Sequence, residues 1–405
     1  MKWGYKVAID KDQSKPSTLA AISNSLNTRF GEHTSISGTD MPEDPPRLPT
    51  GIYIFDHSSG GGFPIHQVSI IKGAEHGGKT SLIMSAMSKV PKICWRCYKP
   101  LSLCSCSLPS IKMRSMWLDV EGTFNKFWAK CIGCNPEDYY LNTSESGNEY
   151  GDVADYALRA DDCGLLVIDS IAALLPSEIM ESSLDAKNVA LQAKLITNLM
   201  NKVNTRLARE RKREHPCLVI VTNQLRANIG GFSPFGPPTP ITPGGHALKH
   251  FSGITVNISK KALTDKDKYH DKERDLTLAQ KHSFYIEKYK SLKLSEGGEF
   301  LRITADIPEL EFKRGDIADF KYVVGRLVDS GLMVKNSNGK YKFENNTGAQ
   351  KDFIDAWKKN RDLYFEVQHK LLSHTIEKII PKEVKECPPE PVKSVEKKPQ
   401  SPPKT

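Results

Sequence analysis

The stretch Gly73-Ala74-Glu75-His76-Gly77-Gly78-Lys79-Thr80 follows an apolar run at residues 68–71 and precedes a helical pattern that begins at Ser81 and continues to Met87. A strand, a glycine-rich loop and a helix in this order are typical of a phosphate-binding P-loop. The glycines let backbone N–H groups face the phosphates, and the helix N-terminus favours negative charge. Lys79 can then reach the terminal phosphates and Thr80 can ligate Mg²⁺. Ordinary glycine-rich turns share this pattern, but in this context it predicts a nucleoside triphosphate site at residues 73–81.

Composition restricts the class of protein. Of the 405 residues, 39% are hydrophobic, which is enough for one large domain with a smaller companion. No apolar run reaches the 18 or so residues of a membrane helix, and charged residues interrupt positions 1–12, so neither a membrane partner nor a signal peptide is expected. We therefore expect a soluble cytoplasmic protein. The net charge of +9 mildly favours a polyanionic partner, although a solvated basic surface is the simpler explanation.

Short apolar runs alternate with helical segments along the chain. The runs that resemble strands are residues 68–71, 116–120, 165–169, 218–222, 254–258, 284–286 and 300–304. The clearest helix spans residues 189–207, where apolar side chains recur every three or four positions. This alternation predicts an α/β fold with a mainly parallel, twisted sheet.

Changes in sequence texture predict four regions. Residues 1–48 form an N-terminal segment with a helix over 18–30, and residues 49–305 form the core. Residues 306–379 form a small C-terminal α/β domain, with a helix near 320–331, a hairpin around Asn338-Gly339 and a helical run from Ala349. Residues 380–405 are rich in Pro, Lys, Glu and Ser and are expected to be disordered.

Two carboxylates follow predicted strands. Asp169 ends the apolar run 165–168, which is the Walker-B arrangement that helps to hold Mg²⁺. Glu121 follows the run 116–120 and could orient or deprotonate the attacking water. The plainer interpretations are a turn or helix cap for Asp169 and a surface charge for Glu121.

The order and spacing of several motifs resemble those of the bacterial RecA recombinase family, including its phage members. The similar motifs are Pro49-Thr50-Gly51, Gly60-Gly61-Gly62-Phe63-Pro64, Asp169-Ser170-Ile171-Ala172-Ala173-Leu174 with Pro176, Asn223-Gln224-Leu225-Arg226 and Gly244-Gly245-His246-Ala247-Leu248-Lys249. The resemblance covers most of residues 18–375. It implies a RecA-type P-loop ATPase core that uses ATP and Mg²⁺, preceded by an N-terminal oligomerisation helix.

The resemblance also implies roles for single residues. Glu121 would be the catalytic carboxylate beside Lys79, and Gln224 would link the γ-phosphate to a DNA-binding loop. Asn125 and Trp128 would lie near the adenine. Lys288 and Lys290 lie at i and i+2 on a predicted strand and so point to one side, where the family places them against the ATP of a neighbouring subunit.

Two segments resemble the DNA-binding loops of the family, residues 178–188 and 228–243. Both are polar or rich in Gly and Pro, as exposed loops are. The resemblance places Val189 and Ile229 as aliphatic wedges between bases, although local packing is the simpler role for each. The resemblance also places residues near the DNA phosphates: Lys194, Arg226, Gly244 and Gly245.

The insertion at residues 91–112 departs from the family. It contains Cys94-Trp95-Arg96-Cys97 and Cys104-Ser105-Cys106. Four closely spaced thiols in a cytoplasmic protein predict a structural Zn²⁺ site, with reduced free thiols or a redox role as the alternatives. The second C-x-x-C motif, Cys131 and Cys134, is interpreted as structural.

Taken together, the residues and the resemblance predict a DNA-dependent ATPase that acts in homologous recombination and DNA repair. It would polymerise on single-stranded DNA and exchange that strand with a homologous duplex, inside a bacterial cell or a phage-infected host and in association with the nucleoid. Single-strand-binding and loader proteins would be its further partners. The alternatives are a hexameric helicase with a RecA core or an ATP-binding DNA-repair accessory protein, and a scaffold that does not hydrolyse ATP.

Overall fold

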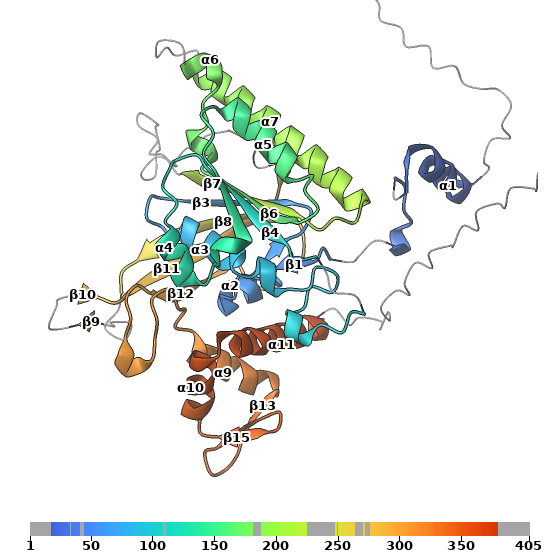
Figure 1. Ribbon diagram of the computed structural model, residues 1–405. Helices are drawn as coiled ribbons and strands as arrows, with labels where there is room; N and C mark the ends of the chain where they lie inside the picture. Colours follow the sequence, from blue (N-terminus) through green and yellow to red (C-terminus); the bar gives the residue numbers. More distant parts are fainter. Residues whose placement is uncertain are drawn as a thin grey trace, which may run out of the picture.

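A single large sheet organises the molecule (Figure 1). The computed structural model describes residues 18–32, 34–40, 44–107, 111–180, 188–224, 248, 250–263, 270–271 and 276–379. Within these residues the main sheet has eight strands in the order β12-β11-β8-β3-β7-β6-β4-β5. Their bounds are β3 Val68–Gly73, β4 Arg114–Asp119, β5 Tyr139–Asn142, β6 Cys163–Asp169, β7 Leu218–Gln224, β8 Ser252–Lys261, β11 Ala279–Tyr289 and β12 Gly297–Ile303.

The sheet is mainly parallel, as the alternation of strands and helices predicts. Strands β5, β4, β6, β7, β3 and β8 pair in parallel, and only β11 runs antiparallel to both of its neighbours. All seven predicted strands are confirmed, whereas the short edge strand β5 was not predicted. The register pairs Gly73 with Gln224 and Asp119 with Asp169. The carboxyl ends of β3, β7, β6 and β4 therefore meet at one edge of the sheet.

Helices cover both faces of the sheet, so its central strands are apolar on both sides. On one face, Ile71, Trp117 and Val167 pack beneath α2 Tyr53–Ser58, α3 Lys79–Met87 and α4 Lys126–Ile132. On the other face, Ile70 and Leu118 pack beneath α5 Gly147–Ala157 and α7 Asn188–Lys212. Alternate residues of one strand therefore enter two separate cores.

Helix α7 confirms the long helix predicted from periodicity. Its buried stripe consists of Ile196, Leu199, Met200, Val203 and Leu207. The helix continues five residues beyond the predicted end, to Lys212, and its last turn holds three basic residues. Cations at a helix C-terminus interact favourably with the helix dipole.

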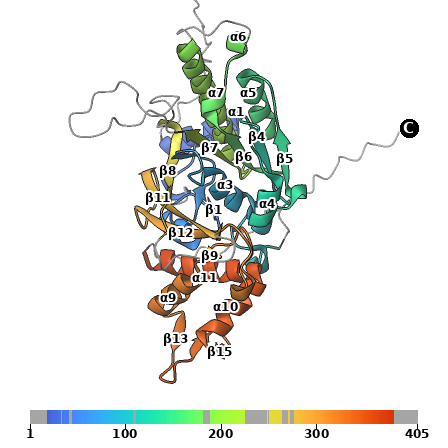
Figure 2. The same ribbon diagram turned by 90° about the vertical axis from the view of Figure 1, so that its left-hand side faces the viewer.

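The C-terminal elements gather at one end of the molecule, opposite α5 and α7 (Figure 2). They are η7 Pro308–Leu310, α9 Phe320–Ser330, β13 Met333–Lys335, β14 Tyr341–Phe343, β15 Asn346–Gly348, α10 Gln350–Lys359 and α11 Arg361–Ile379. The predicted helix and hairpin are confirmed, while β15 and the break at Asn360 within the helical run were not predicted. These elements share a core of their own, yet Phe365 of α11 belongs to the core of the main sheet. The division at residue 305 stays a prediction.

The N-terminal helix α1, Leu19–Phe30, lies apart from the sheet in Figure 1. The predicted helix is confirmed, and Thr18 caps it by accepting a hydrogen bond from the Ala21 N–H. The helix has no buried residue, and Leu19 is 84% and Phe30 60% exposed. The predicted disordered tail, residues 380–405, lies outside the described residues.

Short elements complete the described chain, and none of its helices is long and apolar enough to cross a membrane. The short elements are η1 Gly38–Asp40, β1 Arg47–Leu48, β2 Phe63–Pro64, η2 Val90–Lys92, η3 Leu101–Leu103, η4 Pro136–Asp138, η5 Ile171–Ala173, α6 Ser177–Met180, β9 His270–Asp271 and β10 Leu276–Thr277.

A buried carboxyl group joins α2 to the C-terminal elements. Asp319 accepts hydrogen bonds from the Tyr364 hydroxyl at 2.6 Å and from the Tyr53 N–H at 3.3 Å. Burial raises the pKa of Asp319 to about 6 from the model-peptide value of 3.8. A raised folded-state pKa means that Asp319 contributes stability at low pH, and this contribution is lost as the pH rises through about 6.

We expect the free energy of unfolding of the wild type, minus that of Asp319→Asn, to fall by up to about 3 kcal/mol between pH 4 and 6.5. Urea titrations of both proteins across this range measure the difference. The comparison removes the contributions of other carboxyl groups, which both proteins share. A difference that is constant with pH would show that Asp319 does not titrate in this way.

Candidate active site

The P-loop connects β3 to α3 at the carboxyl edge of the sheet. Its glycines lie where larger residues would collide with neighbouring groups. A Cβ atom on Gly73 would lie 2.2 Å from the carbonyl oxygen of Ile258. Gly78 precedes the first residue of α3 with a φ of 102°, and a Cβ atom there would lie 2.5 Å from Nδ1 of His282. The loop therefore requires glycine at both positions.

Lys79 begins α3 and is buried inside the loop. Its ammonium donates hydrogen bonds to the carbonyl oxygens of Gly73 at 3.0 Å and Ala74 at 2.8 Å. Burial lowers the pKa of Lys79, and the carboxylates of Asp169 and Glu121 oppose that shift. The cation is therefore held against the backbone that would surround a phosphate.

Oxygen ligands suited to Mg²⁺ meet next to the P-loop. The Thr80 hydroxyl donates to a carboxylate oxygen of Asp169 at 3.0 Å, and the Thr222 hydroxyl donates to the other. Burial raises the pKa of Asp169, and the charge of Glu121 adds to the shift. Adjacent ligands of an octahedral Mg²⁺ lie about 3 Å apart, because each is about 2.1 Å from the ion. The oxygens of Thr80 and Asp169 fit this requirement.

Glu121 lies two residues beyond β4 and is half-buried. Its carboxylate accepts hydrogen bonds from the Gln224 side-chain amide at 2.8 Å and from the Ser170 hydroxyl. The turn that carries Glu121 is fixed by Asp119, whose carboxylate accepts hydrogen bonds from the N–H groups of Thr123 and Phe124, both at 3.0 Å. The structure thus joins Glu121 and Gln224, which the sequence suggested separately. The supporting roles of Asp119 and Ser170 had not been predicted.

The residues expected near the base lie beside the P-loop helix. The Trp128 indole N–H donates to the Ser81 hydroxyl at 2.9 Å. Asn125 caps α4, where its side chain accepts a hydrogen bond from the Trp128 N–H at 2.8 Å. The Asn125 side-chain oxygen therefore has a local structural role, and the contact of both residues with adenine stays a prediction.

His282 is a contact of the P-loop that the sequence did not indicate. It is buried on β11, and its Nδ1 lies 2.9 Å from the carbonyl oxygen of Gly77. Burial lowers the pKa of His282 to about 4, so the ring is neutral at pH 7 and Nδ1–H is the donor to this carbonyl. A single histidine in a strand pattern gives no local signal for such a contact, because β11 reaches the P-loop only through the sheet.

The prediction that Lys288 and Lys290 lie on one strand is wrong for Lys290. Strand β11 ends at Tyr289, so Lys290 lies just beyond it and the pair is not wholly within a strand. Burial lowers the pKa of Lys288, and the charge of Lys290 adds to this shift. Lys288 pairs with Thr255, which pairs with Ile70, three residues before Gly73. Lys288 therefore lies about 10 Å along the strands from the start of its own P-loop, towards the opposite edge of the sheet.

Much of the predicted DNA-binding surface lies outside the described residues. This applies to Arg226, Ile229, Gly244, Gly245 and residues 228–243, and to 181–187 of the first loop, whose first residues, 178–180, belong to α6. Val189 lies in the first turn of α7, and Lys194 is exposed on the same helix. Gln192 holds this end of α7 to the segment after β6, because its amide donates to the carbonyl oxygens of Ala172 and Leu174.

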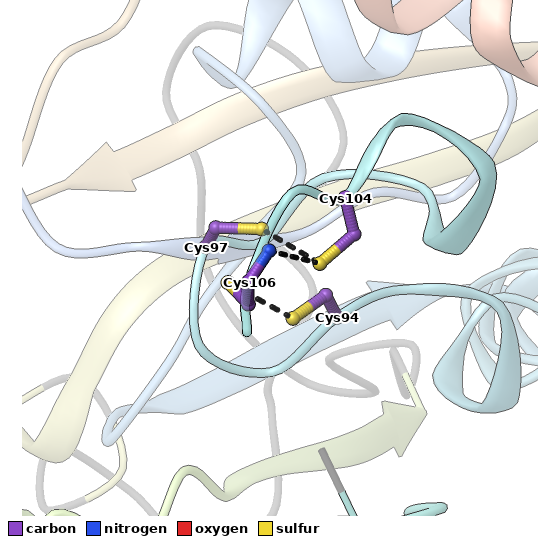
Figure 3. Close-up of side chains that lie close together, drawn as sticks. All are labelled: Cys94, Cys97, Cys104 and Cys106. Atoms are coloured by element: carbon purple, nitrogen blue, oxygen red, sulfur yellow. Dashed lines mark hydrogen bonds between the residues drawn. The ribbon is translucent and has the colours of Figure 1, made fainter. Parts of the chain in front are cut away.

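The four cysteines of the insertion converge, whereas the second C-x-x-C pair is separate from them (Figure 3). Cys134 is buried, and its thiol donates to the carbonyl oxygen of Met84 at 3.2 Å. This contact is consistent with the structural role expected of Cys131 and Cys134.

Substitution of the P-loop lysine tests this site. We expect Lys79→Ala to lower the rate of ATP hydrolysis at saturating ATP by on the order of 100-fold or more, because the variant loses the cation closest to the phosphates. Lys130→Ala, which removes an exposed lysine of α4, is the control and should hydrolyse ATP normally. Equal rates for the wild type and Lys79→Ala would rule out this assignment.

Comparison with known proteins finds similarity to RecA proteins in each case. The RecA N-terminal domain family matches residues 105–282, a range that contains Glu121, Asp169 and Gln224 but begins after the P-loop. The DNA repair protein recA homolog 3, mitochondrial, of Arabidopsis thaliana is 29% identical over 226 residues, which cover 56% of this chain and 47% of the relative. Protein RecA of Xanthomonas campestris is 28% identical over 251 residues, or 62% of this chain and 66% of the relative. Protein RecA of Gloeobacter violaceus is 27% identical over 266 residues, or 65% of each chain.

The matches thus span about half to two thirds of the length of these relatives. The range that the domain family matches includes the strand ends at which the structure gathers the acidic residues and the glutamine. The P-loop lies just before the range that the domain family matches, and its geometry completes the same site. Over these ranges the chain is similar to proteins of the RecA family.

Proposed function

We propose that this protein is a DNA-dependent ATPase that polymerises on single-stranded DNA and exchanges that strand with a homologous duplex, in recombination and DNA repair. The observation that carries the proposal is the convergence of Lys79, Asp169, Glu121 and Gln224 at the carboxyl ends of four neighbouring strands. The names of the relatives, RecA and a DNA repair protein, support the same function.

Each residue at this edge has a role in ATP hydrolysis. The N–H groups of the P-loop and Lys79 would bind the phosphates, and Thr80 and Asp169 would hold Mg²⁺, which would supply positive charge beside them. Glu121 lies two residues beyond the neighbouring strand β4, where its carboxylate can accept a proton from the attacking water. Trp128 and Asn125 flank the start of α3, where the base would bind.

Gln224 supplies the connection to DNA. It ends β7, and the segment expected to form the second DNA loop follows directly after it. Its amide already contacts Glu121 at 2.8 Å, so a change at the phosphates that alters Glu121 also alters Gln224. We infer that Arg226, Lys194, Gly244 and Gly245 contact the DNA backbone and that Val189 and Ile229 separate base triplets.

Two features favour assembly into a filament. Helix α1 leaves Leu19 and Phe30 exposed, which suits a helix that packs on a neighbouring subunit. Lys288 and Lys290 lie too far along the sheet to serve their own P-loop, which suits a role at the ATP of the next subunit. Each active site would then be shared between two copies of the chain.

The catalytic carboxylate can be tested on its own. We expect Glu121→Gln to retain ATP binding and to lose hydrolysis by about 100-fold or more, because glutamine keeps the shape but cannot accept the proton. Single-turnover hydrolysis and nucleotide-binding titrations, with and without single-stranded DNA, separate the two effects. Glu137→Gln, at an exposed glutamate, is the control. Near-normal hydrolysis by Glu121→Gln would mean that another residue positions the water.

Assembly distinguishes a recombinase from a ring-shaped motor. With ATP and single-stranded DNA, electron microscopy should show helical filaments, because a head-to-tail interface that does not close generates a helix. Closed hexameric rings would instead indicate a helicase.

A mixing experiment then tests whether the site is shared. Lys79→Ala and the double variant Lys288→Ala with Lys290→Ala should each be inactive, and their mixture should recover part of the ATPase activity. In mixed filaments, an intact P-loop from one variant can meet intact lysines from the other. A mixture as inactive as its components would contradict a shared site.

A further inference from the structure

The insertion contains a cysteine cluster, Cys94, Cys97, Cys104 and Cys106, that no part of the ATPase chemistry uses. The first pair is Cys94 and Cys97, and the second pair is Cys104 and Cys106. Figure 3 shows the four side chains close together. All four sulfur atoms lie within 4.8 Å of one another. The Sγ atoms of Cys94 and Cys106 are 3.9 Å apart, and those of Cys97 and Cys104 are 3.7 Å apart.

These distances fit one tetrahedral ion and exclude disulfides. A disulfide requires sulfur atoms about 2.05 Å apart, and the eight cysteines that the structure describes are all free. Four thiolates about 2.3 Å from a central Zn²⁺ lie about 3.8 Å from one another at the corners of a tetrahedron. The two measured separations bracket this value.

The backbone holds the cluster in place. The Cys94 N–H donates a hydrogen bond to the Lys99 carbonyl oxygen at 2.8 Å, and the Cys94 carbonyl oxygen accepts one from the Tyr98 N–H at 2.7 Å. The first pair of cysteines therefore lies on one closed turn. In the second pair, the Cys106 N–H donates a hydrogen bond to the Cys104 sulfur at 3.3 Å. Donors directed at sulfur stabilise thiolates and orient metal ligands.

The charge of the surrounding sequence complements such a site. A Zn²⁺ ion with four thiolates carries a net charge of −2. No acidic residue occurs between positions 88 and 118, whereas six basic residues do: Lys89, Lys92, Arg96, Lys99, Lys112 and Arg114. A basic segment lowers the cost of concentrating negative charge on the sulfurs.

The insertion lacks a core that could hold the second pair of cysteines. Ile93 and Trp95 belong to the core of the main sheet, and the Trp95 indole N–H donates to the Val90 carbonyl at 2.8 Å. Beyond Pro100, no residue up to Ser107 is buried, and Leu101 is 51% exposed. A metal ion can supply the folding free energy that apolar burial does not.

We propose that the cysteine cluster binds one Zn²⁺ in a closed structural site and thereby secures the insertion against α11. The turn that carries Cys94 is adjacent to this helix, because Lys92 forms an ion pair with Asp362 at 2.7 Å and the Lys89 ammonium lies 4.6 Å from the centre of the Phe365 ring. In Figure 1 the insertion lies beside one end of α11. The site connects the nucleotide-binding part of the chain to its last helix.

Metal analysis of the purified full-length protein tests the proposal. We expect about one zinc per chain in the wild type and in Cys131→Ser, the control, which removes a half-buried thiol outside the cluster. Cys97→Ser with Cys104→Ser should lose the zinc. In this double variant the amide hydrogens of residues 94–106 and of α11 should exchange faster than in the wild type, while ATP still binds. Lys79→Ala should keep its zinc, so failure of the ATPase assignment and failure of this one are distinguishable.

A second measurement covers the case in which the double variant does not fold. Removal of zinc from the wild type by a chelator should accelerate the same amide exchange, and added zinc should reverse it. Cobalt should replace zinc and give the visible absorption of a tetrahedral thiolate site. Wild-type protein that contains no metal and four reactive thiols, iron in place of zinc, or disulfides between these cysteines would each overturn the proposal.

Discussion

The register of the parallel strands is the constraint on which the site depends. Backbone hydrogen bonds pair Gly73 with Gln224, Ile168 with Val221 and Asp119 with Asp169, so the four strands end at the same edge of the sheet, with β3 and β7 extending about two residues beyond β6 and β4. A shift of one residue in any of these pairings would turn the side chains of that strand to the opposite face. The two apolar cores prevent such a shift, because Ile70 and Ile71 must enter different faces of the sheet. Hydrophobic burial thereby fixes the positions of groups that are themselves polar.

The polar groups at this edge form two adjoining sets of hydrogen bonds. Thr80 and Thr222 bind the two oxygens of Asp169, and Ser170 and Gln224 share one oxygen of Glu121. Groups that are buried and hydrogen-bonded in this way are rigid before any ligand binds. Gln224 ends β7, just before the segment expected to contact DNA. Its hydrogen bond to Glu121 therefore links the site expected to bind the phosphates to that segment. His282 supports the opposite side of the P-loop from a strand that is distant in sequence.

The C-terminal elements are tied to the nucleotide-binding part at several places. Arg302 of β12 is buried, and its guanidinium donates to the Ser85 hydroxyl of α3 at 2.7 Å and to the Gly315 carbonyl at 2.9 Å. Asp319 links α2 with α11, and the insertion with its cysteine cluster lies against α11. These contacts explain why Phe365 belongs to the core of the sheet although the other buried apolar residues of α11 pack with the C-terminal elements. The insertion thus adds to a junction that buried polar groups already hold.

The sequence by itself determined the elements and the kind of chemistry. Short apolar runs identified seven strands of the main sheet and helical periodicity identified α7, since burial requires apolar residues at these positions in the chain. The P-loop and the acidic residues after two strands were also evident, because their spacing along the chain is part of their function. Short elements such as β5 and α4 were not predicted, since their few apolar residues give no clear period.

Only the tertiary structure decided which distant groups meet. The pairing of Glu121 with Gln224 and the contact of His282 with Gly77 join residues that are 103 and 205 positions apart. It also placed Lys290 beyond the end of β11 and brought the sulfur atoms of the two cysteine pairs within 4.8 Å of one another. The physical reason is the same in each case. Sheet register and core packing are set by the whole chain at once, whereas a sequence motif records only its near neighbours.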